Sequence, residues 1–280
     1  MRSGAFKSTV FPLNRGVDYS ALRACSLFLL DMDGTLWLGD ELLPGARELV
    51  HTLTQTGRRV VYLTNNSSRA APDYVRRLQD FGFPCRAGDV FTSGMATAMY
   101  LREHYPGAPL FVVGTPALHG ELEGYGLRLQ DCEESVVVLG FDRTLNYEKL
   151  TRAVHLLRCG APYVAANPDL VCPLAGGEVL PDCGSIAALL KAATGREPTF
   201  IGKPSRRMVE LVAEREGVAA AQVCCVGDRL YTDMAAAYNA GAVSALVLSG
   251  ETTPAMLREA ERAPDYVFED AAALRAALLG

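Results

Sequence analysis

Two aspartates at the end of an apolar run are the first residues in this sequence that could do chemistry. Asp31 and Asp33 follow the run Ser26–Leu30 and precede Gly34. Side chains two residues apart along a strand point the same way, and a bend at Gly34 could bring the Asp33 backbone carbonyl to the same point. Such a group of oxygen atoms suits Mg²⁺. The alternative interpretation is an acidic turn, because Asp-Gly is a common turn pair.

Two further groups suit an anionic ligand. Thr64, Asn65 and Asn66 follow a second apolar run, and a hydroxyl with free backbone N–H groups before a helix can bind an anion. The alternative is an ordinary helix cap. Lys203, in Gly202-Lys203-Pro204, follows another apolar run and could neutralise a phosphate as a point charge. The alternative is a surface lysine.

A fourth group, again after an apolar strand and a glycine, is acidic. It contains Asp228 and, five residues later, Asp233. Carboxylates of this kind hold Mg²⁺ together with a substrate phosphate and water. Asp233 could instead be a carboxylate that a helix dipole stabilises. Each group alone competes with its alternative, whereas four of them in one chain, each at a strand end, indicate a single site.

The elements that must position these groups alternate along the chain. Short apolar runs such as Ser26–Leu30 and Val60–Leu63 are separated by helical patterns such as Pro44–Thr56. This alternation is typical of an α/β fold whose parallel strands are buried on both faces. Ligands in such sheets bind beyond the carboxyl ends of the strands, where all four groups are expected to lie.

Composition excludes several other classes of protein. The 280 residues include 27 Lys+Arg and 32 Asp+Glu, and the net charge of −5 argues against a nucleic-acid surface. No signal peptide or membrane span is visible, so we expect a soluble, cytoplasmic protein. Without a Gly-rich dinucleotide or P-loop motif, those two classes lose their main support. We interpret the eight cysteines as reduced core residues. The four histidines are scattered, with no pair at metal-ligand spacing.

Taken together, the four motifs resemble the haloacid dehalogenase superfamily of phosphohydrolases, from about Ser26 to the C-terminus. The Thr-Asn-Asn motif and the long insert before Lys203 resemble the subfamily with an inserted α/β cap, which includes 4-nitrophenyl, pyridoxal, phosphoglycolate and nucleotide phosphatases. Ala166-Asn167-Pro168-Asp169 also matches that cap, whereas Asp182 stands where a glycine is common. The resemblance implies a Rossmann-like parallel-sheet core at residues 1–104 and 198–280, with the cap at residues 105–197.

The resemblance also implies a mechanism, namely Mg²⁺-dependent hydrolysis of a phosphate monoester through an aspartyl-phosphate on Asp31. Asp33 would protonate the leaving group and then activate water. The other implied roles are Mg²⁺ binding by Asp31, Asp228 and the Asp33 backbone oxygen, phosphoryl binding by Thr64, Asn65, Asn66 and Lys203, orientation of Lys203 or a metal-bound water by Asp233, and lining of the substrate pocket by Cys172.

Two other functions stay open at this point. One is a phospho-signalling receiver, which needs less than half this chain and leaves the insert before Lys203 unexplained. The other is a non-catalytic protein that binds a phosphometabolite. The expected partner is a small phosphorylated metabolite, which the motifs do not identify, and the resemblance implies a homodimer through the cap. Trp37, close to the first motif, either walls the pocket or packs in the core.

Overall fold

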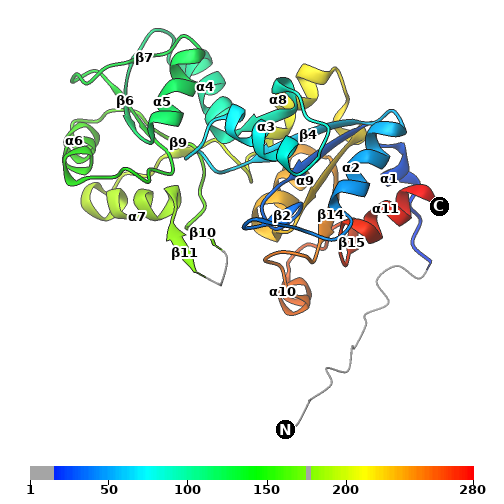
Figure 1. Cartoon of the computed structure of the whole chain (residues 1–280). Coiled ribbons are helices and arrows are strands. Elements are labelled where there is room, and N and C mark those ends of the chain that lie inside the picture. The colour runs from blue at the N-terminus through cyan, green and yellow to red at the C-terminus, as the bar shows by residue number, and fades with distance from the viewer. Residues whose placement is uncertain (1–15, 175–177) are drawn as a thin grey trace.

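The structure, a computed structural model, describes residues 16–174 and 178–280 of the chain. The first fifteen residues of the predicted core segment therefore lie outside the described part. A first sheet has six parallel strands in the order β15-β14-β13-β1-β4-β5 (Figure 1). These strands are β1 (Leu27–Asp31), β4 (Arg59–Thr64), β5 (Val90–Thr92), β13 (Val223–Gly227), β14 (Val243–Val247) and β15 (Tyr266–Phe268).

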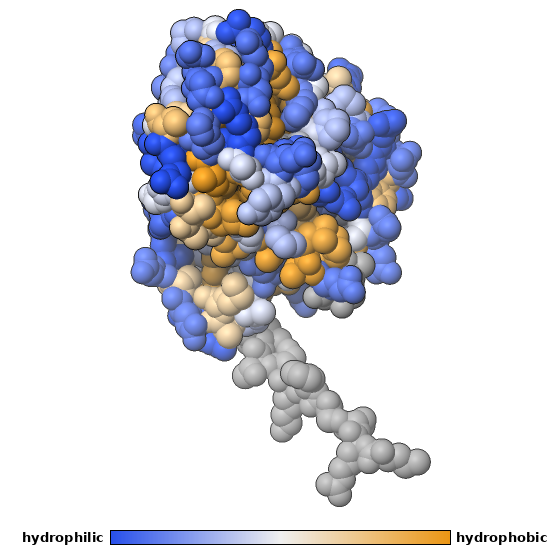
Figure 2. All heavy atoms as spheres, turned by 90° about the vertical axis from the view of Figure 1, so that its left-hand side faces the viewer, coloured by the Kyte–Doolittle hydropathy of each residue, from blue (hydrophilic) through white to orange (hydrophobic). Residues whose placement is uncertain are grey.

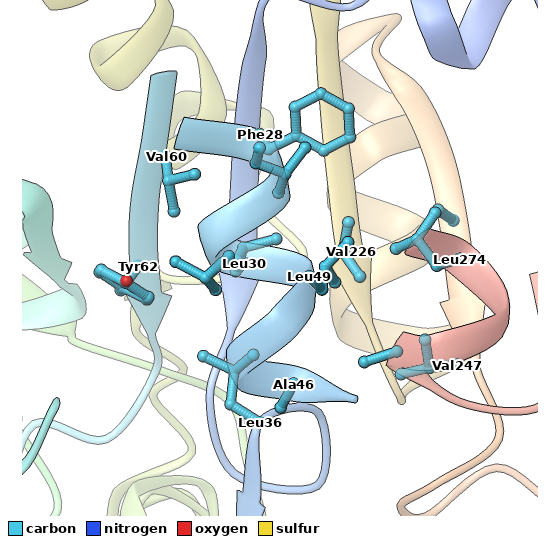
Figure 3. Packing of buried hydrophobic residues seen from close by; sticks show 14 of the residues in the cluster. Phe28, Leu30, Leu36, Ala46, Leu49, Val60, Tyr62, Val226, Val247 and Leu274 are labelled. Carbon is cyan, nitrogen blue, oxygen red and sulfur yellow. The ribbon is translucent and has the colours of Figure 1, made fainter. Parts of the chain in front are cut away.

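Helices cover both faces of this sheet, because its strands are apolar on both sides. Phe28 and Leu30 of β1 pack in a cluster on one face (Figure 3). Leu27 and Leu29 pack in a separate cluster on the other face. The helices on the first face are α1 (Ser20–Ala24), α2 (Ala46–Gln55), α3 (Ala71–Asp80) and α11 (Ala271–Leu279). Those on the second are α4 (Ser93–His104), α8 (Arg206–Glu216) and α9 (Ala235–Ala240). The predicted doubly covered parallel sheet is confirmed.

A second, five-stranded parallel sheet is inserted between α4 and α8, in the order β12-β9-β8-β6-β7. Its strands are β6 (Pro109–Val113), β7 (Arg128–Leu129), β8 (Val136–Leu139), β9 (Tyr163–Ala165) and β12 (Thr199–Phe200). Helix α5 (Pro116–Gly124) packs on one face, and α6 (Tyr147–Arg158) with α7 (Cys183–Thr194) on the other. This inserted α/β unit confirms the predicted cap, while its exact boundaries stay a prediction.

Smaller elements complete the described chain. An antiparallel hairpin follows the end of β1, formed by β2 (Trp37–Leu38) and β3 (Glu41–Leu42). A second hairpin, β10 (Val171–Pro173) with β11 (Val179–Pro181), lies between β9 and α7. The others are the 3₁₀ turns Ala87–Asp89 and Ala220–Gln222, the π-helical turn Leu230–Met234 and α10 (Pro254–Glu259).

The cysteines differ in part from the prediction of buried core residues. That prediction is right for Cys25, Cys85, Cys183, Cys224 and Cys225. It is wrong for Cys159, which is exposed at the end of α6, and for Cys132 and Cys172, which are half-buried. Within the described residues, no helix is both long and apolar enough to cross a membrane.

Candidate active site

Three of the four predicted groups meet because their strands are neighbours. Strand β1 lies between β4 and β13, so Asp31, Thr64 and Asp228 come together at the carboxyl edge of the first sheet. Lys203 arrives by another route, on the segment that returns from β12 to α8. A cavity of about 40 Å³ lies at this edge. Its lining includes Asp31, Asp33, Thr64, Asn65, Asn66, Cys172, Lys203 and Asp233.

Lys203 is buried and bridges two carboxylates, which excludes the surface-lysine interpretation. Its Nζ donates to Asp31 Oδ1 at 2.5 Å and to Asp233 Oδ1 at 2.6 Å, and the residue is only 4% exposed. Burial alone would lower the pKa of Lys203, but the charges of Asp233 and Asp31 raise it well above its ordinary value. The ammonium therefore stays charged, and Asp233 holds it against Asp31.

At the cavity, three carboxylates lie close to the single ammonium group of Lys203, so their negative charge exceeds its positive charge. Asp31, Asp228 and Asp233 each offer an oxygen, and these oxygens lie within 4.8 Å of one another. Burial raises the pKa of Asp31 well above its usual range, with Asp233 and Asp228 adding to the rise and Lys203 opposing it. Burial first, and Asp233 second, raise the pKa of Asp228 to about 7. A bound cation would offset this repulsion and keep Asp31 ionised.

The donor set fits Mg²⁺. Asp228 Oδ1 is buried and has no hydrogen-bond partner among the described residues, while Oδ2 accepts from the backbone N–H of Glu251 at 2.6 Å. Gly34, at φ +88°, lets this carboxylate approach, because a Cβ there would lie 2.4 Å from Asp228 Oδ2. An unpartnered carboxylate oxygen beside a second carboxylate is what a hard dication requires.

Asp33 is oriented by a tryptophan that sequence reasoning left undecided. The fully buried Trp37, on the β2–β3 hairpin, donates from Nε1 to Asp33 Oδ1 at 2.8 Å. The indole also lines a second cavity next to the first. Trp37 therefore packs in the core, walls a pocket and fixes one carboxylate oxygen of Asp33.

Replacing Trp37 by phenylalanine is expected to lower kcat about tenfold with little change in KM, because the hydrogen bond that orients the Asp33 carboxyl group is lost. Steady-state kinetics on p-nitrophenyl phosphate measures both constants, and circular dichroism checks the fold. The matched control is Phe81→Leu, since Phe81 stacks on Trp37 at 5.5 Å but donates no hydrogen bond to Asp33. An equal fall in kcat for the control would contradict the orienting role.

In the Thr64-Asn65-Asn66 group, Thr64 and Asn66 line the cavity, while the side chain of Asn65 connects separate segments of the chain. Thr64 is buried, and its Oγ1 accepts from the Asn66 backbone N–H at 3.1 Å. The Asn65 side chain joins three segments, because it donates to Asp169 Oδ2 and the Lys203 carbonyl and accepts from the Lys203 N–H. A contact of Asn65 with a ligand would thus have to come from its backbone. Asn66 Nδ2 lies 4.0 Å from Cys172 Sγ, at the mouth of the cavity.

Sequence reasoning missed an ion pair that connects the two sheets at the site. Arg229 Nη1 lies 3.3 Å from Asp169 Oδ1, and its Nε lies 2.9 Å from Glu251 Oε2. Asp169 follows β9 of the second sheet, whereas Arg229 follows β13 of the first. The signal was available, because Asp169 stands just beyond a strand end like the four motifs. This pair and Asn65 hold the inserted unit against the core.

Asp182 replaces the glycine common in the resembled family, and the structure shows what it does. It begins α7, where its Oδ1 accepts from the Cys183 N–H at 2.5 Å and from Asn167 Nδ2 at 3.0 Å. Burial is the largest cause that raises its pKa from 3.8 to about 6. Because the folded form binds the proton more tightly, Asp182 contributes stability that is complete below about pH 3.8 and is lost as the pH rises through about 6.

The variant Asp182→Asn should remove this pH dependence while it retains the helix cap. The interval from 3.8 to about 6 corresponds to as much as about 3 kcal/mol. Relative to wild type, the variant is therefore expected to gain up to that much stability between about pH 4 and about pH 7.5. Urea unfolding of both proteins at the two pH values measures the difference, and a difference that does not change with pH would contradict the assignment.

Family models, curated proteins and solved structures are similar to this chain in sequence or in fold. Residues 28–128 match the model of the haloacid dehalogenase-like hydrolases, and residues 200–274 match a second HAD-hydrolase-like model. A curated relative, dihydroxyacetone phosphatase from Corynebacterium glutamicum, is 36% identical over 247 residues, which cover 88% of this chain and 90% of the relative.

Two solved structures are similar over most of the chain. The 4-nitrophenylphosphatase from Thermotoga maritima is 46% identical, with a TM-score of 0.87, and the match covers 92% of this chain and 99% of that one. The glycerol phosphate phosphatase from Mycobacterium tuberculosis, solved in complex with magnesium, is 35% identical, with a TM-score of 0.83 and coverage of 91% and 77%.

Proposed function

The chain belongs to the haloacid dehalogenase-like hydrolases and is a phosphatase of that family, and we propose that it cleaves small phosphate monoesters in two steps through a phosphorylated Asp31. The observation that carries this proposal is the buried ammonium of Lys203 between Asp31 and Asp233. It places a fixed positive charge beside the carboxylate nucleophile, where a phosphoryl group would receive the attack.

In the first step an Asp31 carboxylate oxygen attacks phosphorus and the ester P–O bond breaks. Asp33 gives its proton to the leaving oxygen, in the orientation that the Trp37 indole sets. In the second step Asp33 accepts a proton from water, which attacks the phosphorylated Asp31 and releases inorganic phosphate. Hydrolysis of the ester is thus divided between two steps, after which Asp31 and Asp33 have returned to their starting states.

The other site residues bind and orient the phosphoryl group. Lys203 neutralises its charge, and Thr64 with the backbone N–H groups after it binds its oxygens. Asp31, Asp228 and the backbone oxygen of Asp33 would hold Mg²⁺, with the unpartnered Oδ1 of Asp228 as one ligand. When bound, Mg²⁺ removes the repulsion between a carboxylate nucleophile and a phosphate dianion.

The leaving group is expected to enter the second cavity, which has a volume of about 360 Å³. Asp33, Asn66 and Cys172 line both cavities, so the general acid lies where the two meet. Arg69 and Arg143 also line the second cavity, and neither forms a hydrogen bond or ion pair with a described residue. This supports a small metabolite as the substrate, with a polar or anionic group that these arginines bind.

Turnover of p-nitrophenyl phosphate with Mg²⁺ and with EDTA tests the proposed reaction. Steady release of p-nitrophenol that needs Mg²⁺ is the expected result, and release that EDTA leaves unchanged would contradict the metal requirement. A stable phosphorylated form without turnover would instead favour a receiver. A panel of three-carbon and two-carbon phosphate esters, with and without a carboxylate, then ranks leaving groups by kcat/KM.

We also propose that the inserted unit, at about residues 105–197, mediates a homodimer. Hydrophobic side chains gather among hydrophilic ones on the face that carries the second sheet (Figure 2). Five exposed apolar residues lie on or beside the β10–β11 hairpin and on α7, namely Leu170, Val171, Leu174, Val179 and Leu189. An exposed apolar group of this kind supports a protein interface. Light scattering at micromolar concentration is expected to give twice the monomer mass, and a monomeric mass would contradict the proposal.

A further inference from the structure

A second group of metal-ligating side chains lies far from the cavity, on the outer side of α6. Glu133, from the segment before β8, faces His155 and Cys159, which are one helical turn apart. The distance from His155 Nε2 to Glu133 Oε2 is 3.0 Å, and that from His155 Nε2 to Cys159 Sγ is 3.8 Å. Figure 1 shows α6 on the side of the second sheet away from the first. None of the three residues lines the proposed active site.

We propose that Glu133, His155 and Cys159 form a binding site for Zn²⁺, separate from the magnesium site of the proposed reaction. A thiolate, an imidazole and a carboxylate are the three ligand types that Zn²⁺ takes in proteins, whereas Mg²⁺ prefers oxygen alone. Three protein ligands leave a fourth position for water. A search for two histidines at metal-ligand spacing misses this site, because the two ligands one helical turn apart are a histidine, His155, and a cysteine, Cys159.

The distances fit a tetrahedral ion. With usual Zn²⁺ bond lengths, the edge of the tetrahedron is about 3.4 Å between nitrogen and oxygen and about 3.6 Å between nitrogen and sulfur. The observed 3.0 Å and 3.8 Å differ from these edges by a few tenths of an ångström. All three ligand atoms lie within 4.8 Å of one another. Because the side chains are exposed, small rotamer changes suffice to close around an ion.

A neighbouring arginine already holds the carboxylate in place. Arg152 donates from Nη1 to Glu133 Oε1 at 2.8 Å and from Nε to Asp131 Oδ1 at 2.6 Å. Glu133 Oε2 is thereby directed toward His155. Hydrogen bonds from Arg152, first, and His155, second, lower the pKa of Glu133, so it is ionised at neutral pH. Support of this kind behind a ligand is typical of metal sites.

Binding of Zn²⁺ would exchange protons for the ion. Cys159 would release its thiol proton to solvent and bind as the thiolate, and His155 would bind through Nε2 with its remaining proton on Nδ1. The ion would join the end of α6 to the segment before β8, so it should raise the melting temperature of the protein by mass action.

Titration of the full chain with Co²⁺ tests the site, with Mg²⁺ in large excess to occupy the carboxylate cluster. Wild type is expected to show one equivalent of a thiolate-to-cobalt charge-transfer band, which Zn²⁺ then removes. His155→Gln should weaken binding at least tenfold, and Cys159→Ser should abolish the band. The matched control is Cys132→Ser, since Cys132 is a half-buried thiol of the same unit outside the cluster.

Alkylation of Cys159 provides a second measurement that does not depend on activity or on a variant. Zn²⁺ should slow the reaction of Cys159 with iodoacetamide at least tenfold, as peptide mass spectrometry measures, and should leave Cys132 unaffected. A wild type without the band and without protection would overturn the proposal. So would a band that persists in Cys159→Ser, because another thiol would then be the ligand.

Discussion

Asp31→Asn is expected to lower kcat by at least about a thousandfold, because an amide cannot form the covalent intermediate. The change is nearly isosteric at the end of β1, so the fold should persist. It also removes one of the two negative charges that face Lys203, which keeps Asp233 at 2.6 Å. Steady-state turnover of p-nitrophenyl phosphate in Mg²⁺ measures the loss, with unfolding curves to show that the variant is folded.

Glu251→Gln is the matched control for Asp31→Asn. Glu251 is another carboxylate close to the site, where it pairs with Arg229, but no proposed step uses it. Its amide variant should therefore lose much less activity. An Asp31→Asn protein that is folded and retains more than a few per cent of wild-type activity would contradict the nucleophile assignment.

Lys203→Met is expected to have the second-largest effect, on both stability and activity. The variant leaves Asp31 and Asp233 facing each other in a buried site, and loss of one member of a buried charge pair costs about 3–5 kcal/mol. The phosphoryl group also loses its fixed positive charge, so kcat should fall at least about a hundredfold. Urea unfolding measures the first effect and p-nitrophenyl phosphate turnover the second.

An exposed lysine provides the comparison for this variant. Among the residues that the structure describes, Lys191 on α7 pairs only with Glu197 at the surface, so Lys191→Met should change stability by less than about 1 kcal/mol and leave turnover unchanged. If Lys203→Met behaved like Lys191→Met in both measurements, the buried ammonium would have neither of the roles assigned to it.

Strand ends made much of the site predictable. Asp31 and Asp228 follow apolar runs that the fold places side by side as β1 and β13, so one rule of parallel sheets was enough to bring them together. Lys203 also follows an apolar run, but that run is β12 of the second sheet. Lys203 thus lies beside Asp31, as predicted, but the strand before it belongs to the second sheet and not to the first sheet, which carries Asp31 and Asp228.

The contacts that sequence reasoning missed depend on tertiary structure. Arg229 meets Asp169 only because a loop of the inserted unit reaches the core, and no local pattern records that approach. The Trp37 indole could have faced any core neighbour, and its hydrogen bond to Asp33 follows from the β2–β3 hairpin. Cys159 is exposed because it ends α6, where the apolar pattern has already stopped.

The proposed reaction depends on a phosphorylated Asp31, and trapping this intermediate tests it most directly. The Asp33→Asn variant, which should form the intermediate and hydrolyse it slowly, is mixed with a ³²P-labelled ester and Mg²⁺, quenched in acid and digested. We expect one labelled peptide, with the phosphoryl group on Asp31, and no label in an Asp31→Asn, Asp33→Asn double variant. A label on another residue, or wild-type turnover in which quenching never yields labelled protein, would contradict the phosphorylation of Asp31.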